Sequence, residues 1–474
     1  MNTVKKGKLT KKMLDETIQL IQDVYLSDSR PWVIGYSGGK DSSCVVQLVW
    51  NALSKLDKQK RNKPVYVITS DTLVETPAIE HHLATSIEQI GTEAKRQGLP
   101  IETHVVKPKT NDTFWVNILG RGYPAPYSNF RWCTDRLKIQ PTTVFIQNTV
   151  AEYGEVVILL GARKAESNTR AQVMNKRTLV GESLSRHKDL PNAFVFTPVE
   201  DWIAEDVWTY LLNSKSPWGF NNRELVTMYR NAQSGECPLV IDKTTPSCGG
   251  GRFGCWSCTV VARDRSMENM IDNGEEWMRP LLDFRDFLTM TQEPATKEEY
   301  REHRRRSGRV EFAESENGKK LIWGPYKMEW RYRFLQMLLE AQKSIRENGP
   351  NPNANLIQPE ELHKIRQLWM HEEGVWDDPL PRIYEEVMGE KLDWTMDDFS
   401  GMGGAEQKLL HEVSKEFNLQ RGFLVSLFDV ERKHDGMTRR SGIYQEIAKV
   451  LRKDWRSRED VLAELAAFKE SEGK

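Results

Sequence analysis

The chain has 474 residues and a formal net charge of −1, with 39% hydrophobic and 28% charged residues. This length is enough for two or three domains, and the composition excludes a disordered or fibrous chain. No apolar run is long enough to span a membrane, and the polar, basic N-terminus is not followed by a signal-peptide core. We therefore expect a cytoplasmic globular protein.

The first thirty residues predict a helix, because apolar residues recur at helical spacing. An apolar strand at 32–34 then leads into a glycine-rich turn and a further apolar helix. Adjacent glycines let backbone N–H groups approach an anion, and the first turn of the helix adds unpaired N–H groups and the positive end of its dipole. The turn therefore predicts a phosphate cradle. Its residues are Ser37, Gly38, Gly39, Lys40, Asp41 and Ser42.

Strands and helices alternate after this turn, with expected strands at 65–68, 103–106, 156–160 and 193–197 and a helix at 78–97. The alternation indicates an α/β fold with a doubly wound, mostly parallel sheet. Ligands of such sheets lie beyond the carboxyl ends of the strands. Ser70 and Asp71 follow the second strand, so we expect them to face the same nucleotide as the cradle.

The run from Ser37 to Ser42 does not have Walker A spacing. It resembles the pyrophosphate loop of the ATP pyrophosphatase family, whose fold is that of the adenine nucleotide alpha hydrolases. The resemblance implies that the loop holds the β- and γ-phosphates and that ATP is cut between the α- and β-phosphates. It also implies that Asp41 helps to hold magnesium, a hard cation that prefers oxygen ligands.

A second motif follows the strand at 156–160, where Gly161-x-Arg163-x-x-Glu166-Ser167-x-x-Arg170 occurs. Glycine at the strand exit permits close approach of the backbone, and arginine forks match phosphate oxygens. Arg163 and Arg170 are therefore candidate phosphate ligands. Together with the cradle and Ser70-Asp71-Thr72, this motif resembles the phosphoadenylylsulfate reductases and their relatives.

Cys133 lies in a segment rich in cations, and Arg131, Arg136 and Lys138 are its neighbours in sequence. Nearby cations lower the pKa of a thiol and make it a better nucleophile, so Cys133 is a candidate catalytic residue. The alternative is a partly buried helical cysteine beside an ordinary charged face.

Four of the six cysteines, Cys237, Cys248, Cys255 and Cys258, fall within a short glycine-rich stretch. In a reducing compartment such clustering favours a metal site over disulfides. Four thiolates suit either structural zinc or an iron–sulfur cluster. Zinc ribbons usually have two Cys-x-x-Cys pairs, and this stretch has one, which favours a [4Fe–4S] cluster.

Over its whole length the sequence resembles the DndC family of DNA phosphorothioation sulfurtransferases. The segments that carry the resemblance, besides the cradle, are Arg131-Trp132-Cys133-Thr134, Cys255-Trp256-Ser257-Cys258, Trp323-Gly324-Pro325-Tyr326 and Ile357-x-Pro359-Glu360-Glu361-Leu362. The resemblance implies replacement of a non-bridging phosphate oxygen of DNA by sulfur that a cysteine desulfurase supplies. It also implies work alongside the phosphorothioation proteins DndD and DndE, and a role for Cys133 in carrying or receiving sulfur.

Two alternatives remain at this point. One is an adenylylsulfate or phosphoadenylylsulfate reductase acting on a small molecule, although the paired cysteines of the iron–sulfur reductases are missing and about 200 residues follow the cysteine run. The other is a non-catalytic module in which nucleotide and cluster control assembly of a DNA complex.

The rest of the chain predicts a mainly helical region, so the expected division is 1–225 for the pyrophosphatase domain, 226–270 for the four-cysteine segment and 271–474 for the helical domain. Basic stretches near Arg304 and Arg452 are candidates for contact with DNA phosphates, which requires only positive charge.

Overall fold

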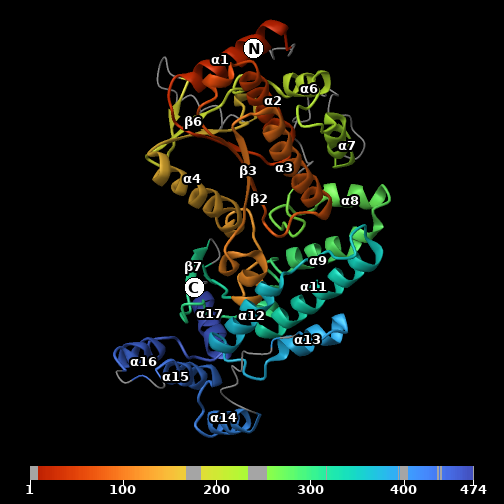
Figure 1. Ribbon diagram of the computed structural model, residues 1–474. Helices are drawn as coiled ribbons and strands as arrows, with labels where there is room; N and C mark the ends of the chain where they lie inside the picture. Colours follow the sequence, from red (N-terminus) through yellow and green to blue (C-terminus); the bar gives the residue numbers. More distant parts are fainter. Residues whose placement is uncertain are drawn as a thin grey trace. The chain divides into compact units, whose positions relative to one another are not determined.

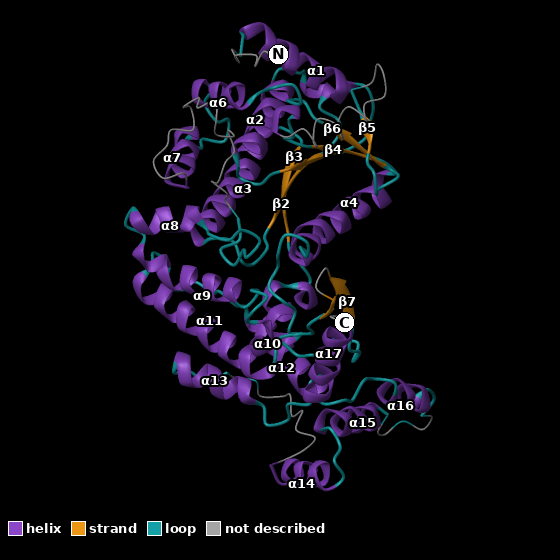
Figure 2. Cartoon of the chain, turned by 180° about the vertical axis from the view of Figure 1, so that it is seen from behind, coloured by secondary structure: helices purple, strands orange, loops and turns teal. Residues whose placement is uncertain are grey.

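The computed structural model describes residues 9–166, 183–232, 254–315, 318–392, 394, 404–434, 437 and 440–472. The chain forms two compact units. The sheet unit comprises Met1–Lys109 and Arg131–Leu282, and the helical unit comprises Thr110–Phe130 and Asp283–Lys474. Figure 1 labels their elements and Figure 2 distinguishes helices, strands and loops. The expected three-part division stays a prediction.

The sheet unit begins with a strand–helix alternation. Its strands are β1 (Trp32–Gly35), β2 (Val65–Ser70), β3 (Ile101–Val106), β4 (Val156–Leu159), β5 (Ser185–Arg186) and β6 (Ala193–Phe196). Its helices include α1 (Lys11–Leu26), α2 (Lys40–Ser54), α3 (Pro77–Gln97), α4 (Gln140–Tyr153), α6 (Ala204–Asn213), α7 (Asn222–Ala232) and α8 (Arg265–Asp272). The π-helical turn η4 (Thr134–Ile139) runs into α4.

The strand order is β3-β2-β1-β4-β6-β5, and only β5 pairs antiparallel to its neighbour. The prediction of a doubly wound, mostly parallel sheet is confirmed. The sequence did not predict β5, because a strand of two residues is too short to show an alternation of apolar and polar side chains. In this order β1 is central, and the chain proceeds outward from it first to β2 and β3 and then to β4. The turn after β1 therefore lies where the strand order reverses, which is the usual ligand position of such sheets.

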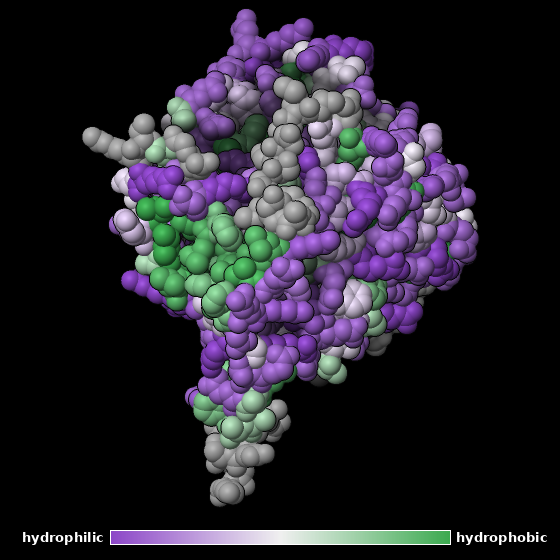
Figure 3. Space-filling model, turned by 90° about the horizontal axis from the view of Figure 1, so that it is seen from below, coloured by the Kyte–Doolittle hydropathy of each residue, from purple (hydrophilic) through white to green (hydrophobic). Residues whose placement is uncertain are grey.

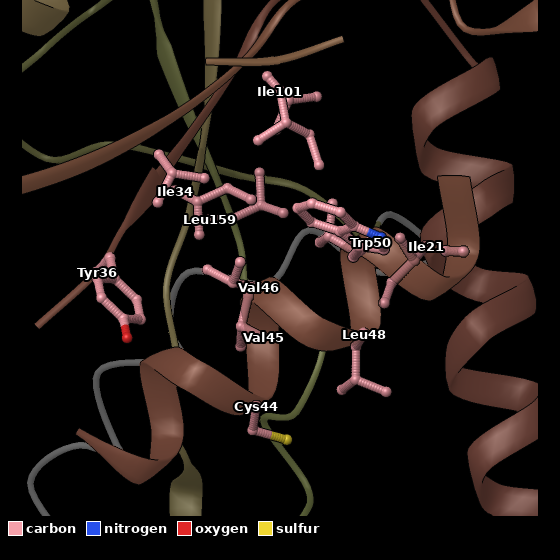
Figure 4. Close-up of a cluster of buried hydrophobic side chains, with 14 of the residues drawn as sticks. Ile21, Ile34, Tyr36, Cys44, Val45, Val46, Leu48, Trp50, Ile101 and Leu159 are labelled. Carbon is pink, nitrogen blue, oxygen red and sulfur yellow. The ribbon is translucent and has the colours of Figure 1, made fainter. Parts of the chain in front are cut away.

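The core lies on both faces of the sheet, because successive strand residues point to opposite sides. Trp32 and Ile34 of β1 belong to the large apolar cluster that α1, α2, α3 and α6 share. Val33, between them, packs in a second cluster with Ile146 of α4. Figure 4 shows side chains of the large cluster, with the buried face of α2 against the strands. The helix that follows the cradle is thus anchored along its length, which fixes the position of its first turn.

The helical unit contains α9 (Arg279–Met290, which begins in the sheet unit), α10 (Lys297–Tyr300), α11 (Met328–Asn348), α12 (Pro359–His371) and α13 (Pro379–Met388). It continues with α14 (Gly404–Glu416), α15 (Arg421–Lys433), α16 (Ile443–Leu451) and α17 (Arg458–Glu472), and it has one hairpin of β7 (Phe312–Ser315) and β8 (Gly318–Leu321). The prediction of a mainly helical region is confirmed. None of the described helices is long and apolar enough to cross a membrane.

Residues 110–130 leave the sheet unit and join the helical unit, which the sequence did not predict beyond a loop at 120–124. Trp115 donates its indole N–H to the Leu356 carbonyl at 2.6 Å, and Trp369 donates to the Leu119 carbonyl at 2.8 Å. The buried Arg331 binds the Gly120 carbonyl at 3.1 Å. The partners of these contacts lie far apart in the sequence, so local patterns do not reveal them.

The surface seen in Figure 3 is mostly hydrophilic, with one gathered apolar area. Many of the exposed large apolar side chains come from α14 to α16 and their connections. They are Leu409, Phe417, Leu419, Phe428, Met437, Tyr444 and Leu451.

Candidate functional site

The predicted phosphate cradle lies between β1 and α2, as the sequence indicated. Gly38 has a φ of +69°, a left-handed conformation that favours glycine. A Cβ atom at this position would also lie 2.7 Å from Leu83 Cδ2. Both the turn and the packing therefore require glycine at residue 38.

Serine hydroxyls hold the turn in shape. Ser42 Oγ donates to the Gly39 carbonyl at 3.0 Å and accepts the Ser37 N–H at 3.2 Å. The hydroxyl of Ser37 lies 3.2 Å from that of Ser42. The cradle is thus preorganised by its own side chains, which lowers the entropic cost of binding an anion.

Three charged side chains meet at the start of α2. Lys40 Nζ lies 2.8 Å from Asp41 Oδ2, and Arg163 Nε lies 2.8 Å from Asp41 Oδ1. The close approach of this segment is possible because residue 161 is glycine: a Cβ there would lie 2.8 Å from the Asp41 carbonyl. The structure thus brings Arg163 to the cradle. In this structure the two oxygens of the Asp41 carboxylate contact Lys40 and Arg163. The role of Asp41 as a magnesium ligand therefore stays a prediction.

The Arg163 guanidinium also has one nitrogen that makes no hydrogen bond within the described residues. Its residue is 1% exposed, and its buried Nη2 has no hydrogen-bond partner among the described residues. A buried guanidinium N–H without a partner costs free energy, so such a group usually marks a place where another acceptor binds. An anionic oxygen next to the cradle would satisfy it.

Two further residues contact the cradle, and no motif in the sequence indicated either of them. The Nε2 atom of His82 in α3 is 3.2 Å from the Gly38 carbonyl oxygen. The imidazole ring of His82 packs against the ring of Phe220 at a centroid distance of 5.0 Å. Burial lowers the pKa of His82. Tyr229 of α7 accepts the backbone N–H of Lys40 at 3.3 Å. Both come from other helices, far away in sequence.

Ser70 and Asp71 lie at the end of β2, as expected. Asp71 is paired with Lys107 at 2.9 Å, and it accepts the Leu73 N–H at 2.9 Å. Leu73 has a φ of +63°, so the Asp71 carboxylate stabilises a strained turn. The Ser70 hydroxyl lies 3.4 Å from that of Thr142. A role for Ser70 and Asp71 on the adenosine side of a nucleotide stays a prediction.

A second feature of the sheet unit is a cavity of about 430 Å³ that Cys133, Cys255 and Cys258 line together. We call it the thiol pocket. Cys133 lies more than 100 residues before the four-cysteine run in sequence, whereas the fold brings it beside Cys255 and Cys258. The cations in its wall are Arg131, Lys138, Arg263 and Arg265.

The pKa of the Cys133 thiol is shifted in the direction opposite to the one that the sequence suggested. Burial, together with the neighbouring Cys258, raises the pKa of Cys133, and this outweighs the lowering by Lys138. The expectation of a lowered pKa is therefore wrong in its net direction. Burial likewise raises the pKa of Cys255 to about 12. Lys138 Nζ lies 3.7 Å from Glu75, so this lysine is shared between a carboxylate and the thiols.

The thiol pocket is attached directly to the loop that follows β2. The Thr72 hydroxyl lies 3.4 Å from Cys255 Sγ and 2.9 Å from Glu75 Oε1. Trp256 donates its backbone N–H to the Val74 carbonyl at 3.0 Å. The Thr76 hydroxyl donates to the Gly254 carbonyl at 3.1 Å. Residues 254–256 are thus hydrogen-bonded to the loop after β2, one of the sheet loops on which nucleotide ligands are expected.

Three predicted site residues, Arg170, Cys237 and Cys248, lie outside the described residues. In the part of the chain that the structure describes, no group of three or more His, Cys, Asp or Glu side chains is placed to hold a metal ion. The four-cysteine ligand set therefore stays a prediction, of which the structure describes Cys255 and Cys258.

Residues 31–260 match the family model for the phosphoadenosine phosphosulfate reductase domain. The chain carries a phosphoadenosine phosphosulfate reductase-like nucleotide-binding domain. The matched range includes the cradle, Arg163 and all the cysteines of the predicted cluster. An uncharacterized protein of Methanocaldococcus jannaschii is 27% identical over 206 residues, which is 42% of this chain and 35% of that protein. The chain thus matches about a third of the length of this relative.

Several solved structures are similar to parts of the chain. A phosphoadenylyl-sulfate reductase from Candida auris has 15% identity and a TM-score of 0.27, covering 45% of this chain and 91% of its own. The U34-tRNA thiolase NcsA from Methanococcus maripaludis, solved with its [4Fe–4S] cluster, has 14% identity and a TM-score of 0.28, covering 60% and 82%. An NAD+ synthetase from Burkholderia pseudomallei has 15% identity and a TM-score of 0.29, covering 46% and 74%.

Proposed function

We propose that the chain is an ATP pyrophosphatase that acts as a sulfurtransferase in DNA phosphorothioation, as its resemblance to the DndC family implies. The observation that carries the proposal is the presence of two sites in one folded unit. The cradle with Lys40 and Arg163 suits pyrophosphate, and the thiol pocket suits sulfur chemistry. The loop after β2 connects the sheet to the second site through Thr72 and Cys255.

The first step is activation of a DNA phosphate. A non-bridging oxygen of that phosphate attacks the α-phosphorus of ATP, the bond to the β-phosphate oxygen breaks, and pyrophosphate leaves. Backbone N–H groups of the cradle, Lys40 and Arg163 stabilise the charge that develops on the leaving group. Magnesium supplies further positive charge when it is bound, and Asp41 is its candidate ligand.

The second step exchanges oxygen for sulfur. A sulfide equivalent attacks the activated phosphorus, the bond to the AMP oxygen breaks, and AMP leaves with the oxygen that sulfur replaces. Cys133 is the candidate to hold this sulfur as a persulfide received from a cysteine desulfurase. Release of sulfide from such a persulfide consumes a second thiol, which forms a disulfide with Cys133.

The thiolate donor set of Cys237, Cys248, Cys255 and Cys258 fits a [4Fe–4S] cluster in its chemistry, and the two described members line one pocket. When bound, the cluster supplies iron that binds thiolate or sulfide. Lys138 and Arg263 of the same pocket attract an anionic sulfur species.

DNA, the desulfurase, DndD and DndE are the proposed partners. Much of the basic stretch near Arg304 is engaged within the helical unit: Arg304 stacks on Trp455 at 5.1 Å, and Arg306 pairs with Glu372 at 3.0 Å. The exposed Arg309 and Arg452 are therefore better candidates for contacts with DNA phosphates.

A small-molecule reductase is the second candidate, favoured by the match of residues 31–260 to the reductase domain. The two functions differ in their products. With ATP, DNA and a sulfur donor, the proposed enzyme releases AMP and pyrophosphate and yields sulfur-containing DNA. Reduction of an adenylylsulfate by a thiol reductant to sulfite and the adenosine phosphate, with neither pyrophosphate nor sulfur-containing DNA formed, would support the reductase instead. Absence of both activities, with nucleotide still promoting assembly on DNA, would support the non-catalytic module.

A further inference from the structure

The N-terminus of α2 makes a contact that bears on how the cradle accepts a phosphate. Tyr229 of α7 places its hydroxyl 3.3 Å from the backbone nitrogen of Lys40, the first residue of the helix. That N–H is one of the donors that a helix N-terminus offers to an anion. Lys40 Nζ also lies 5.5 Å from the centre of the Tyr229 ring. One tyrosine thus contacts both the backbone donor and the side-chain cation of the same cradle residue.

A phosphate oxygen that accepts the Lys40 N–H must come within about 3 Å of that nitrogen. The Tyr229 hydroxyl stands in this place, so the two acceptors compete for one donor. Arg163 Nη2 has no hydrogen-bond partner among the described residues, which is the independent sign that an anion belongs here. We infer that Tyr229 is a displaceable occupant of the phosphate position, so that binding of a nucleotide phosphate moves it away from the start of α2. This inference rests on the proposed function of the cradle.

The consequence follows from what α7 contacts next. The Tyr229 ring packs edge-on against Trp208 of α6 at 5.2 Å, and α7 packs beside α8 in both ribbon views (Figures 1 and 2). Met267 and Met270 of α8 line the thiol pocket. Therefore α7 touches the cradle through Tyr229 and the wall of the thiol pocket through α8. When a nucleotide phosphate displaces Tyr229, α7 shifts against α8 and the change reaches the wall of the thiol pocket within the same folded unit. The thiol pocket thus responds to whether the cradle holds a phosphate, which would prevent sulfur delivery before a phosphate is activated.

The test measures binding of magnesium pyrophosphate by calorimetry to the full chain and to its Tyr229→Phe variant. Phenylalanine keeps the ring against Trp208 and Lys40 and removes only the competing hydroxyl. Since a single hydrogen bond is worth about a factor of five in an equilibrium constant, we expect the variant to bind about fivefold more tightly. Tyr444→Phe, which removes the hydroxyl of a tyrosine on α16 that is 85% exposed, serves as the control and should leave the affinity unchanged.

Amide hydrogen exchange measures whether a change at the cradle reaches α7 and α8. In the wild type, pyrophosphate should increase amide exchange in α7 and alter it in α8, while in Tyr229→Phe the α7 exchange should be high before any addition. Equal or weaker binding by Tyr229→Phe would overturn the inference, and weaker binding would identify the hydroxyl as a ligand of the anion. If wild type and Lys40→Ala both fail to bind pyrophosphate, the proposed function of the cradle fails together with the inference.

Discussion

The hydroxyl of Thr72 lies 3.4 Å from the sulfur of Cys255, which joins the loop after β2 to the thiol pocket. The same hydroxyl is 2.9 Å from Glu75, whose backbone forms a β-bridge with Cys255. Two residues 183 positions apart in the chain are thereby held in contact. The loop after β2 and the described residues around Cys255 are therefore held together as one structural element.

Replacing Thr72 by valine tests that contact, because valine keeps the shape and removes the hydroxyl. We expect a loss of about 1 kcal/mol of local stability around Cys255. Limited proteolysis of the cysteine segment and iron content per chain should both reveal a looser segment, while pyrophosphate affinity stays near the wild-type value. Unchanged proteolysis and iron content would show that the backbone contacts at Val74 and Glu75 hold the segment without the hydroxyl.

Arg163 should be needed for anion binding rather than for folding. Methionine retains much of its apolar stem but removes the guanidinium, including the buried Nη2 that has no partner within the described ranges. We expect the affinity for magnesium pyrophosphate to fall at least tenfold, since a charge-assisted hydrogen bond contributes about 1.5–3 kcal/mol. Arg223→Met, on the exposed side of α7, is the matched control. A variant at 163 that binds normally would remove Arg163 from the site.

Gly38 and Gly98 offer a matched pair for the cradle. Both have positive φ, +69° and +64°. A Cβ at Gly38 would lie 2.7 Å from Leu83, whereas a Cβ at Gly98 meets nothing within 4 Å. Alanine at 98 should therefore cost only the backbone strain, about 1 kcal/mol, with nucleotide binding retained. Alanine at 38 should abolish nucleotide binding as well, as judged by calorimetry and thermal unfolding of each variant.

Glu361 in α12 predicts a pH dependence of the helical unit. Burial raises its pKa from 4.5 to about 7 in the folded state, while its carboxylate still accepts the Gln358 N–H at 2.9 Å. Because the folded state keeps the proton more strongly, the contribution of Glu361 to the free energy of unfolding is largest below about pH 4.5 and is lost as pH rises toward 7. The full change is on the order of 3 kcal/mol.

Denaturant unfolding between pH 4.5 and 8 checks this dependence. Glu361→Gln should flatten it, because glutamine cannot ionise, whereas Glu360→Gln on the exposed face should keep the wild-type slope. An identical slope in wild type and Glu361→Gln would assign the dependence to other groups.

The sheet and the cradle could be predicted from the sequence because their signals are local. Alternating apolar segments give the strands, and the run from Ser37 to Ser42 gives the turn and the helix start. Gly161 and Arg163 also followed from a local motif, and the structure places both against Asp41.

The parts of the site that could not be predicted from the sequence depend on contacts between residues far apart in the chain. His82 and Tyr229 reach the cradle from α3 and α7, and neither lies in a recognisable pattern. Cys133 joins Cys255 and Cys258 only because the fold places η4 beside the cysteine loop. The pKa of Cys133 was misjudged for a related reason: the sequence shows the neighbouring cations but not the burial that outweighs them.

The most direct test of the central claim is the fate of ATP. ATP labelled in its α-phosphate is incubated with the full chain, DNA, magnesium and a cysteine desulfurase with cysteine, and the nucleotide products are separated. We expect labelled AMP with equimolar pyrophosphate and phosphorothioate DNA, and loss of all three products in Lys40→Ala. Labelled ADP with free phosphate, or AMP release that Lys40→Ala leaves unchanged, would contradict this expectation.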